Sequence, residues 1–213
     1  MDPQTAVHQS NNEFGSPVVL NGSRHHPIFS RFSCWQGKVP AGQYANFLGI
    51  KTKAEFDSLS PDCPEIHYCK PDYPVHDEQY FEWIDLLQAV ITAEEHFTMI
   101  ELGAGFGRWI CNAAAALKQV NDLPCTLIGM EAEPTHFGWM KEHLQVNGVD
   151  PNCCQLIQAA VAAQDGEIGF EVGQHPVYGG PKDYYGQAIG GKTLVKAISL
   201  NTLLQPLKKV DPH

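Results

Sequence analysis

The segment Phe97–Trp109 constrains the fold of this chain more than any other, because it joins an apolar run to a glycine-rich turn. The run ends at the acid Glu101, and Gly103, Gly105 and Gly107 follow at every second position before a helical pattern begins. Such glycines let the backbone take positive φ and come close to a ligand. The segment is therefore typical of the strand, loop and helix at which α/β proteins bind nucleotides.

A second acid, Glu131, ends the next apolar run, Cys125–Met130. In a parallel sheet the carboxyl ends of neighbouring strands lie at the same edge, so Glu131 and the glycine turn are expected to face one pocket. A carboxylate in that position can accept hydrogen bonds from both hydroxyls of a ribose. The two features together predict a site for a cofactor that contains adenosine.

The spacing of the glycines separates the classes of cofactor. Dinucleotide sites use G-x-G-x-x-G, whose third glycine lets the helix pack closely beneath a pyrophosphate. Arg108 stands at that third position, and Glu101 lies two residues before Gly103. A carboxylate there suits S-adenosylmethionine, which carries a sulfonium and an ammonium group instead of phosphates. A nicotinamide or flavin site and a plain strand-to-helix connection are the alternatives.

These motifs resemble the class I methyltransferases, and within them the FkbM family of O-methyltransferases. Glu101–Gly107 is similar to the first motif of the family. Glu131–Phe137, followed by Asn147 and Gly148, is similar to its spacing of acid, proline, aromatic residue and Asn-Gly pair. The resemblance covers about Tyr80 to Leu204 and implies a Rossmann-like α/β sheet.

Two further segments agree with this family, and three features depart from it. Ala159–Phe170 resembles its alanine-rich strand end with an Asp-Gly turn, and Ser199–Leu204 resembles its Ser-Leu-Asp-Thr-Leu-Leu segment. Asn201 replaces the aspartate of that segment, and Arg108 with Trp109 is bulkier than the family's usual residues. The Asp-x-Glu-Gly strand that should come next is absent from the sequence, so we expect only the N-terminal half of the sheet.

The resemblance implies S-adenosyl-L-methionine as the cofactor and assigns residues to its parts. The residues so assigned are Glu101, Gly103, Ala104 and Gly105 at the methionine end, Gly107 in the same turn, Glu131 at the ribose, and Gln158, Ala159 and Ala160 near the adenine. The implied reaction is O-methylation of a small molecule or a sugar hydroxyl. A truncated methyltransferase-like module without turnover is the alternative, and a nicotinamide dehydrogenase is disfavoured by Arg108.

Methyl transfer to a hydroxyl is an in-line attack that needs positioning and a base to remove the proton. The sequence assigns the role of catalytic base to no single residue. The side chains expected to flank the mouth of the pocket, as candidate bases or acceptor contacts, are His76, His175, Tyr178, Asp183, Tyr184 and Tyr185.

Composition excludes several other classes of function. The formal net charge of −10, from 24 acids against 14 bases, argues against a nucleic-acid substrate, because phosphate binding relies on clustered Lys and Arg. No apolar run reaches the roughly 18 residues of a membrane span, and no secretion signal is visible, so we expect a cytoplasmic protein without membrane contact. The seven cysteines lack C-x-x-C pairs, which favours reduced thiols. Cys63, His67 and Cys69 are too few and too widely spaced for structural zinc, so no metal is expected.

Composition also divides the chain into three parts. Residues 1–27 are polar and are expected to form a flexible arm, whereas residues 28–75 place prolines and glycines between aromatic residues and predict an irregular cap of short helices and turns. Residues 76–213 would form the cofactor-binding domain, incomplete at its C-terminal side. The resulting open strand edge is one that a second copy of the chain, in a homo-oligomer, would cover.

Periodicity and turn signals predict the elements of this domain. Helices are expected over 77–95, 106–120 and 135–146, the last closed by Asn147 and Gly148. Parallel strands are expected over 98–102, 126–131 and 155–161. A turn at 165–166 leads into a strand over 167–173, and a loop over 177–192 precedes a short strand over 192–199 and a helix over 200–207.

Overall fold

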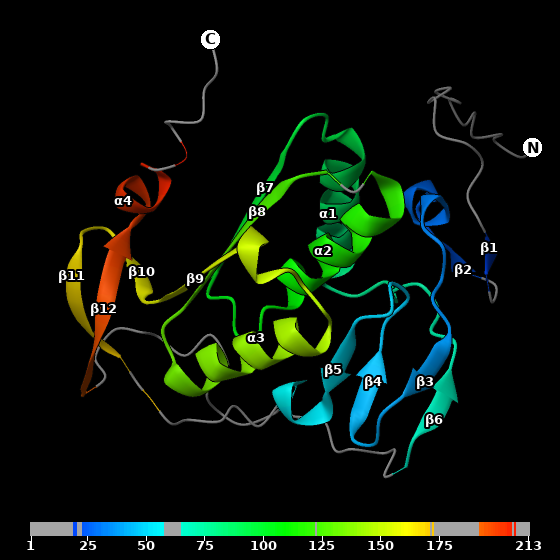
Figure 1. Ribbon diagram of the computed structural model, residues 1–213, viewed down its shortest axis with the longest axis horizontal. Coiled ribbons are helices and arrows are strands. Elements are labelled where there is room, and N and C mark those ends of the chain that lie inside the picture. The colour runs from blue at the N-terminus through cyan, green and yellow to red at the C-terminus, as the bar shows by residue number, and fades with distance from the viewer. Residues whose placement is uncertain are drawn as a thin grey trace, which may run out of the picture.

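The computed structural model describes residues 19–20, 23–57, 65–121, 123–170, 172, 192–205 and 207. Its centre is a parallel sheet of three strands in the order β7-β8-β9 (Figure 1). These strands are β7 (Phe97–Leu102), β8 (Cys125–Glu131) and β9 (Cys154–Gln158). The chain therefore has the Rossmann-like α/β fold that its sequence predicts.

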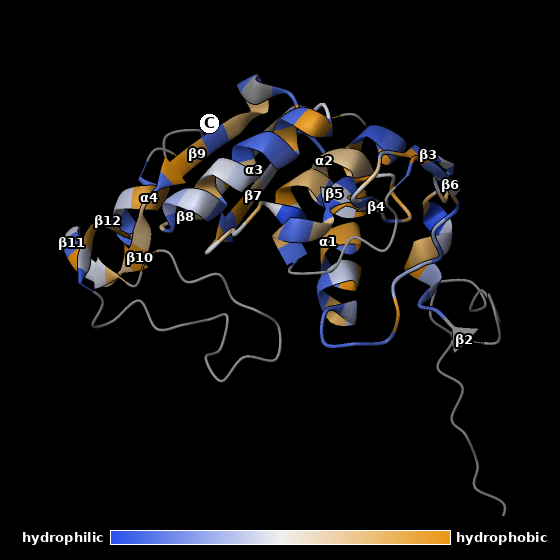
Figure 2. Cartoon of the chain, turned by 90° about the horizontal axis from the view of Figure 1, so that it is seen from below, coloured by the Kyte–Doolittle hydropathy of each residue, from blue (hydrophilic) through white to orange (hydrophobic). Residues whose placement is uncertain are grey.

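Three helices accompany the sheet, and all three confirm predicted helices with slightly different ends. They are α1 (Tyr80–Thr92), α2 (Arg108–Val120) and α3 (Pro134–Val146). A β-carbon added to Gly129 would lie 2.7 Å from Cδ1 of Ile110 in α2 and 2.7 Å from Sδ of Met140 in α3, so the two helices cover the same face of β8. Figure 2 shows hydrophobic residues along β9 and within α1 and α2. Because Gly129 has no side chain, α2 and α3 can both pack closely on β8.

The predicted end of α3 is confirmed in detail. Gly148 has a φ of 62°, and its amide donates to the carbonyl of Gln145 at 3.1 Å. The amide of Val149 donates to the carbonyl of Leu144 at 3.0 Å. These are the bonds by which a left-handed residue satisfies the last carbonyls of a helix.

The predicted strand over 155–161 is wrong in its second half. The chain leaves the first sheet at Ala159, and β10 (Ala160–Ala162) joins a second sheet in the order β10-β12-β11. Its other strands are β11 (Gly166–Phe170) and β12 (Thr193–Ser199), which precedes the short helix α4 (Leu200–Leu204). The predicted turn and final strand are confirmed, and α4 is shorter than expected.

The second sheet packs on the opposite face of β8 from α2 and α3. Ile128 and Met130 of β8 form a small buried cluster with Ile198 of β12 and Leu203 of α4. Burial of both faces of β8 explains why it reads as a continuous apolar run in the sequence. Packing against this face, rather than local propensity, determines where the chain leaves β9.

The predicted irregular cap contains more strand structure than expected. Two antiparallel pairs form, β3 (Gly37–Val39) with β6 (His67–Cys69) and β4 (Gln43–Ala45) with β5 (Lys51–Lys53). The 3-10 helix η1 (Pro27–Arg31) precedes β3, and the 3-10 helix η2 (Ala54–Asp57) lies between β5 and β6. A third 3-10 helix, η3 (Pro151–Cys153), lies outside the cap and precedes β9. A further pair, β1 (Val19–Leu20) and β2 (Ser23–Arg24), lies within the segment predicted as an arm.

The cap and the parallel sheet share one hydrophobic core. Phe29 and Phe47 of the cap pack edge-on at 5.8 Å between ring centroids, and Phe47 contacts Trp83 of α1 at 5.2 Å. The same buried cluster continues to Leu87 of α1 and Leu127 of β8. The cap is therefore held against α1 by apolar contacts, and the boundaries of the three predicted parts stay predictions.

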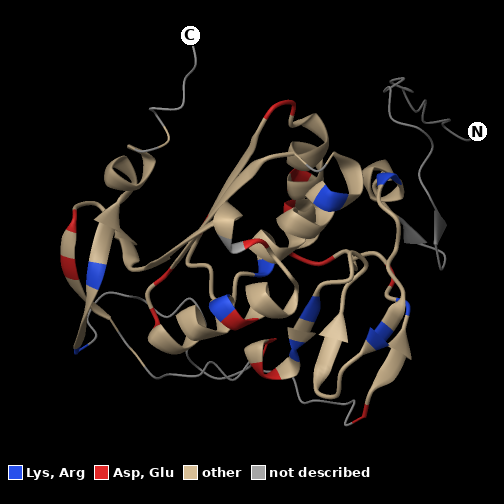
Figure 3. Cartoon of the chain, viewed as in Figure 1, with Lys and Arg blue, Asp and Glu red and all other residues tan. Residues whose placement is uncertain are grey.

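The outer edge of the first sheet is β7, which pairs only with β8 among the described residues. An oligomer that covers this edge stays a prediction. Figure 3 shows Lys and Arg spread over η1, β3, β5, α3 and β12 rather than gathered in one place. Within the described part of the chain, no helix has the length and apolar character needed to cross a bilayer.

His143 of α3 is enclosed where the cap, α2 and α3 meet. Its side chain is 1% exposed. Its Nε2 lies 3.0 Å from the hydroxyl of Thr52, and its Nδ1 lies 3.1 Å from the carbonyl oxygen of Phe106. Burial lowers the pKa of His143 to about 4, because the charged imidazolium would lose its hydration.

The enclosure of His143 predicts a contribution to stability that is lost in mild acid. Because the folded pKa lies below the ordinary value of 6.5, the unfolded chain takes up a proton first as the pH falls. The His143 contribution is complete above pH 6.5 and is lost towards pH 4, by about 3 kcal/mol. Urea unfolding of the wild-type protein and of His143→Gln at several pH values between 7.5 and 4 isolates it, because all other groups titrate in both. The stability advantage of the wild-type protein should shrink by about 3 kcal/mol over this range, and a difference that does not change with pH would contradict the assignment; His96→Gln, at an exposed site, is the control.

Candidate functional site

The glycine turn folds over the carboxyl end of β8. Gly103, Gly105 and Gly107 have φ values of 66°, 54° and 73°, a region that side chains disfavour. The amide of Ala104 donates to the carbonyl of Met130 at 2.9 Å, and that of Gly107 donates to the carbonyl of Ala104 at 2.7 Å. The positive φ that the sequence predicts for this turn is therefore confirmed.

Glu101 lies beneath the start of α2 and caps it. The N-cap residue is Gly107, which has no side chain to cap the helix itself. The Glu101 carboxylate instead accepts from the amides of Trp109 and Ile110, at 3.3 and 3.0 Å. Burial raises the pKa of Glu101 to about 7, and the two amides and the Arg108 guanidinium only partly oppose this effect. The site thus holds a carboxylate that is incompletely ionised at neutral pH.

Glu131 joins the turn to the ends of β8 and β9. Its side chain is 7% exposed, and its two oxygens accept from the amides of Gly105 at 2.7 Å and Glu133 at 2.8 Å. Its backbone carbonyl accepts from the amide of Ala159 at 3.1 Å. The structure therefore brings together the turn, Glu131 and the start of the segment predicted near the adenine.

Glu133 is buried, although an acid at the start of a helix reads in the sequence as a solvated side chain. The residue is 6% exposed. Its Oε2 caps α3 by accepting from the amide of His136 at 2.8 Å. Its Oε1 is buried and has no hydrogen-bond partner among the described residues. The residue whose amide donates to Glu131 thus has a buried carboxylate oxygen without a protein donor in the described part of the chain.

A cavity of about 440 Å³ opens beside the glycine turn, between the cap, the segment before α1 and the start of α2. It is lined by Phe56, Asp57, Glu78, Gln79, Glu82, Glu101, Leu102, Gly103, Ala104, Gly105, Phe106, Arg108 and Trp109. All four residues predicted at the methionine end of the cofactor are in this set. The lining residues do not include Glu131, Gln158, Ala159 or Ala160. Glu131 is nevertheless hydrogen-bonded to the amide of Gly105, which does line the cavity.

Gly107 has a packing role that its prediction as a cofactor contact did not include. It is not among the lining residues of the cavity. A β-carbon there would lie 2.8 Å from Cγ of Met140 and 3.1 Å from Cδ1 of Leu144. The absence of a side chain at Gly107 therefore allows α3 to approach the turn.

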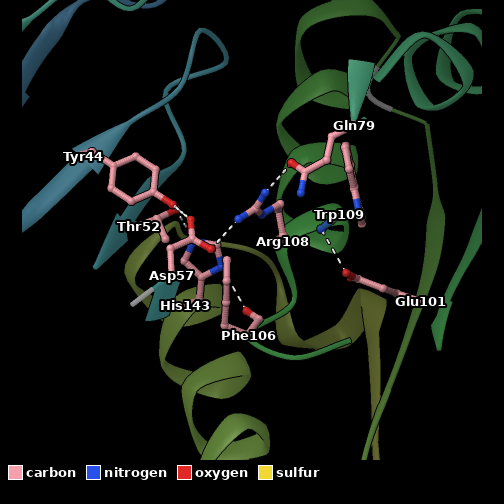
Figure 4. Close-up of polar contacts among 9 residues, drawn as sticks. All are labelled: Tyr44, Thr52, Asp57, Gln79, Glu101, Phe106, Arg108, Trp109 and His143. Atoms are coloured by element: carbon pink, nitrogen blue, oxygen red, sulfur yellow. Dashed lines mark hydrogen bonds and ion pairs between the residues drawn. The ribbon is translucent and has the colours of Figure 1, made fainter. Parts of the chain in front are cut away.

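Sequence reasoning missed the polar network on the cap side of the cavity (Figure 4). Arg108 forms an ion pair with Asp57 of η2 and donates a hydrogen bond to the side chain of Gln79. The hydroxyl of Tyr44 donates to Asp57. Burial, and the nearby Asp57 charge, raise the pKa of Tyr44. Asp57 carries no signal in the sequence, and Arg108 stood out only as a departure from a motif.

The candidate bases stay predictions. His76 stacks on His25 at 5.3 Å and packs on Tyr80 at 4.2 Å between ring centroids, and it is not among the residues that line the cavity. The remaining candidates lie outside the described residues: His175, Tyr178, Asp183, Tyr184 and Tyr185. Cys63 also lies outside them, and within the described ranges no three His, Cys, Asp or Glu side chains gather as a metal site.

The chain is similar to two methyltransferases, at low sequence identity. No family model matches this chain. It is 26% identical over 148 residues to "Putative methyltransferase" of Jannaschia sp. (strain CCS1), a match that covers 68% of this chain and 50% of that protein. The chain thus spans about half the length of this curated relative. The SAM dependent methyltransferase from Agrobacterium tumefaciens, a solved structure, is 22% identical with a TM-score of 0.33, over 45% of this chain and 30% of that one. Membership of the FkbM family stays a prediction.

Proposed function

We propose that this chain holds the methyl donor of an S-adenosylmethionine-dependent methyltransferase. The observation that carries the proposal is the position of Glu101, which lines the cavity and occupies the first amides of α2. A helix start that is already capped by a carboxylate repels an anion and attracts a cation. The sulfonium and ammonium groups of the donor meet this requirement.

The hydrogen bonds of the turn also disfavour a dinucleotide. A pyrophosphate is bound by backbone amides at the start of the helix. The amides of Ala104, Gly105 and Gly107 all donate to acceptors within the protein. Few donors of this turn are left for phosphate oxygens, which supports adenosylmethionine over a nicotinamide or flavin cofactor.

Glu131 and Glu133 supply acceptors for the ribose in this proposal. A carboxylate oxygen accepts more than one hydrogen bond, so the bonds that Glu131 receives from two amides leave it capacity for a hydroxyl. The buried Oε1 of Glu133 lacks a donor among the described residues, and a hydroxyl would satisfy it. Gln158, Ala159 and Ala160 would then lie near the adenine, next to Glu131.

The acceptor side follows from the resemblance to O-methyltransferases. We propose a hydroxyl of a small molecule or a sugar as the acceptor, in a cytoplasmic protein. The cap contributes Phe56 and Asp57 to the cavity, so it is suited to shape the acceptor site. A methyltransferase-like module that binds the donor without turnover is the second candidate.

Removal of the Glu131 carboxylate is expected to weaken binding of S-adenosylhomocysteine, the demethylated product, by at least about tenfold. Hydrogen bonds to a charged acceptor contribute about 1.5–3 kcal/mol each, and two would be lost to the ribose. Isothermal titration of the wild-type protein and Glu131→Ala measures the change. Glu95→Ala, at an exposed site outside the pocket, is the matched control.

Two results would overturn this proposal. One is a wild-type protein that does not bind the product at all, and the other is equal affinity in Glu131→Ala. Because the two oxygens of Glu131 accept from the amides of Gly105 and Glu133, Glu131→Gln keeps an acceptor for one of these amides and should disturb the turn less than Glu131→Ala does. Thermal unfolding of each variant separates lost binding from lost structure.

A further inference from the structure

The described residues that line the cavity include one base and four acids. The acids are Asp57, Glu78, Glu82 and Glu101, and the base is Arg108. Glu101 is bonded to the start of α2, whereas Arg108 extends towards the cap and the segment before α1 (Figure 4). The Arg108 guanidinium and the Glu101 carboxylate therefore point to different sides of the cavity, and Asp57 lies on the Arg108 side.

The guanidinium of Arg108 is held in place by groups from different parts of the chain. Asp57 comes from η2 of the cap, and Gln79 precedes α1. The side chains of Arg108 and Asp57 are only 26% and 14% exposed, and the guanidinium carbon lies 5.3 Å from the centre of the Phe106 ring. A planar group fixed in this way loses little further conformational freedom when it binds a ligand.

The donor proposed for this site ends in an amino acid, which carries an ammonium and a carboxylate group. Glu78, Glu82 and the ionised form of Glu101 attract the ammonium and the sulfonium, but they repel the carboxylate. Asp57 is already paired with Arg108. Arg108 is the one base among the described residues that line the cavity, and its fork of donors matches a carboxylate. A zwitterionic end can therefore enter this cavity with its carboxylate towards Arg108.

We infer that Arg108 binds the carboxylate at the amino-acid end of the donor, and that Asp57 and Gln79 are positioning residues which hold the guanidinium there. The inference rests on the proposed function and assigns a role to a residue that departs from the family pattern. It makes the cap part of the donor site, since Asp57 reaches Arg108 from η2. A purely structural ion pair between the cap and α2 is the alternative.

Two ligands that differ only at their amino-acid end distinguish these roles. S-adenosylhomocysteine carries the carboxylate, and 5′-methylthioadenosine has the same adenosine and thioether without the amino acid. We expect Arg108→Gln to weaken binding of the first by at least about tenfold and binding of the second by less than about twofold. Arg108→Lys, which keeps the charge without the fork, should lie between. Arg31→Gln, an exposed arginine of η1, is the charge-matched control.

A wild-type measurement covers the case in which Arg108→Gln fails to fold. The decarboxylated analogue of S-adenosylhomocysteine should bind the wild-type protein at least about tenfold more weakly than S-adenosylhomocysteine itself. Without an anchor for the carboxylate the order would reverse, because Glu78, Glu82 and ionised Glu101 favour the more positive ligand.

The outcomes are separable. Equal or tighter binding of the decarboxylated analogue overturns the role of Arg108, and so does an equal loss of both ligands in Arg108→Gln. Unchanged affinity of that variant for S-adenosylhomocysteine overturns it too. A wild-type protein that binds neither adenosine ligand contradicts the proposed function instead.

Discussion

Glu101→Gln is expected to stabilise the protein at pH 8 and to leave its stability at pH 4.5 nearly unchanged. Burial raises the pKa of Glu101 from 4.5 to about 7. Because the folded pKa lies above the unfolded one, the unfolded chain releases its proton first as the pH rises. The folded state therefore loses stability between pH 4.5 and pH 7, and the loss is complete above pH 7. Glutamine removes this loss of about 1–3 kcal/mol.

Urea unfolding at pH 4.5 and pH 8 tests this result. Glu95→Gln, an exposed acid, should show no such difference. The expected gain is the net effect after the hydrogen bonds that Glu101 accepts from Trp109 and Ile110 are weakened. A variant that is less stable than the wild-type protein at pH 8 would show that capping of α2 outweighs the cost of the buried charge.

The same substitution is expected to weaken binding of adenosylmethionine. In the wild-type protein a cationic ligand favours ionised Glu101, so affinity for adenosylmethionine should rise from pH 6 to pH 8. Affinity for the uncharged thioether of adenosylhomocysteine should rise less. Glu101→Gln should remove this difference and weaken adenosylmethionine by about tenfold, which corresponds to about 1.4 kcal/mol. Equal losses for both ligands at every pH would instead indicate altered packing of the turn.

Gly107→Ala is expected to destabilise the protein by about 2–5 kcal/mol. A left-handed backbone costs a residue with a side chain roughly 1–2 kcal/mol, and an extra methyl in a packed site costs about 1–3 more. Gly107 has a φ of 73°, and its added β-carbon would lie 2.8 Å from Met140. The variant therefore combines backbone strain with a steric clash against α3.

Gly148→Ala is the matched control for Gly107→Ala. It has a φ of 62°, but nothing lies within 4 Å of an added β-carbon. We therefore expect it to lose only the backbone contribution of about 1–2 kcal/mol. Chemical denaturation of both variants at pH 7.5 measures the difference. Equal destabilisation would show that α3 adjusts to the added methyl without cost.

The helices and parallel strands were predictable because their signals are local. Apolar spacing located α1, α2 and α3, and the Asn147 and Gly148 pair located the end of α3. The strand boundary at Ala159 was not predictable, because an alanine-rich segment suits either sheet. The chain leaves the first sheet there because Ile198 and Leu203, which come much later in the sequence, pack on β8.

The candidate site divides in the same way. The turn and Glu101 were predictable as cavity residues, because glycine and acid are neighbours in the sequence. Asp57 was not, since it reaches Arg108 across 51 positions and no local pattern specifies that partner. The packing role of Gly107 was not predictable either, because it depends on contacts with α3. The ribose and adenine residues stay predictions, although Glu131 is bonded to the turn.

The amino-acid sequence by itself determined the parallel α/β layout and the acid and glycine turn, because both depend on short-range periodicity and on backbone freedom. Tertiary structure alone decided how the cap closes over that turn and which charges meet there. Contacts of this kind follow from the packing of distant apolar residues, such as Phe47 against Trp83, and the polar network of Asp57 and Arg108 is placed by that packing.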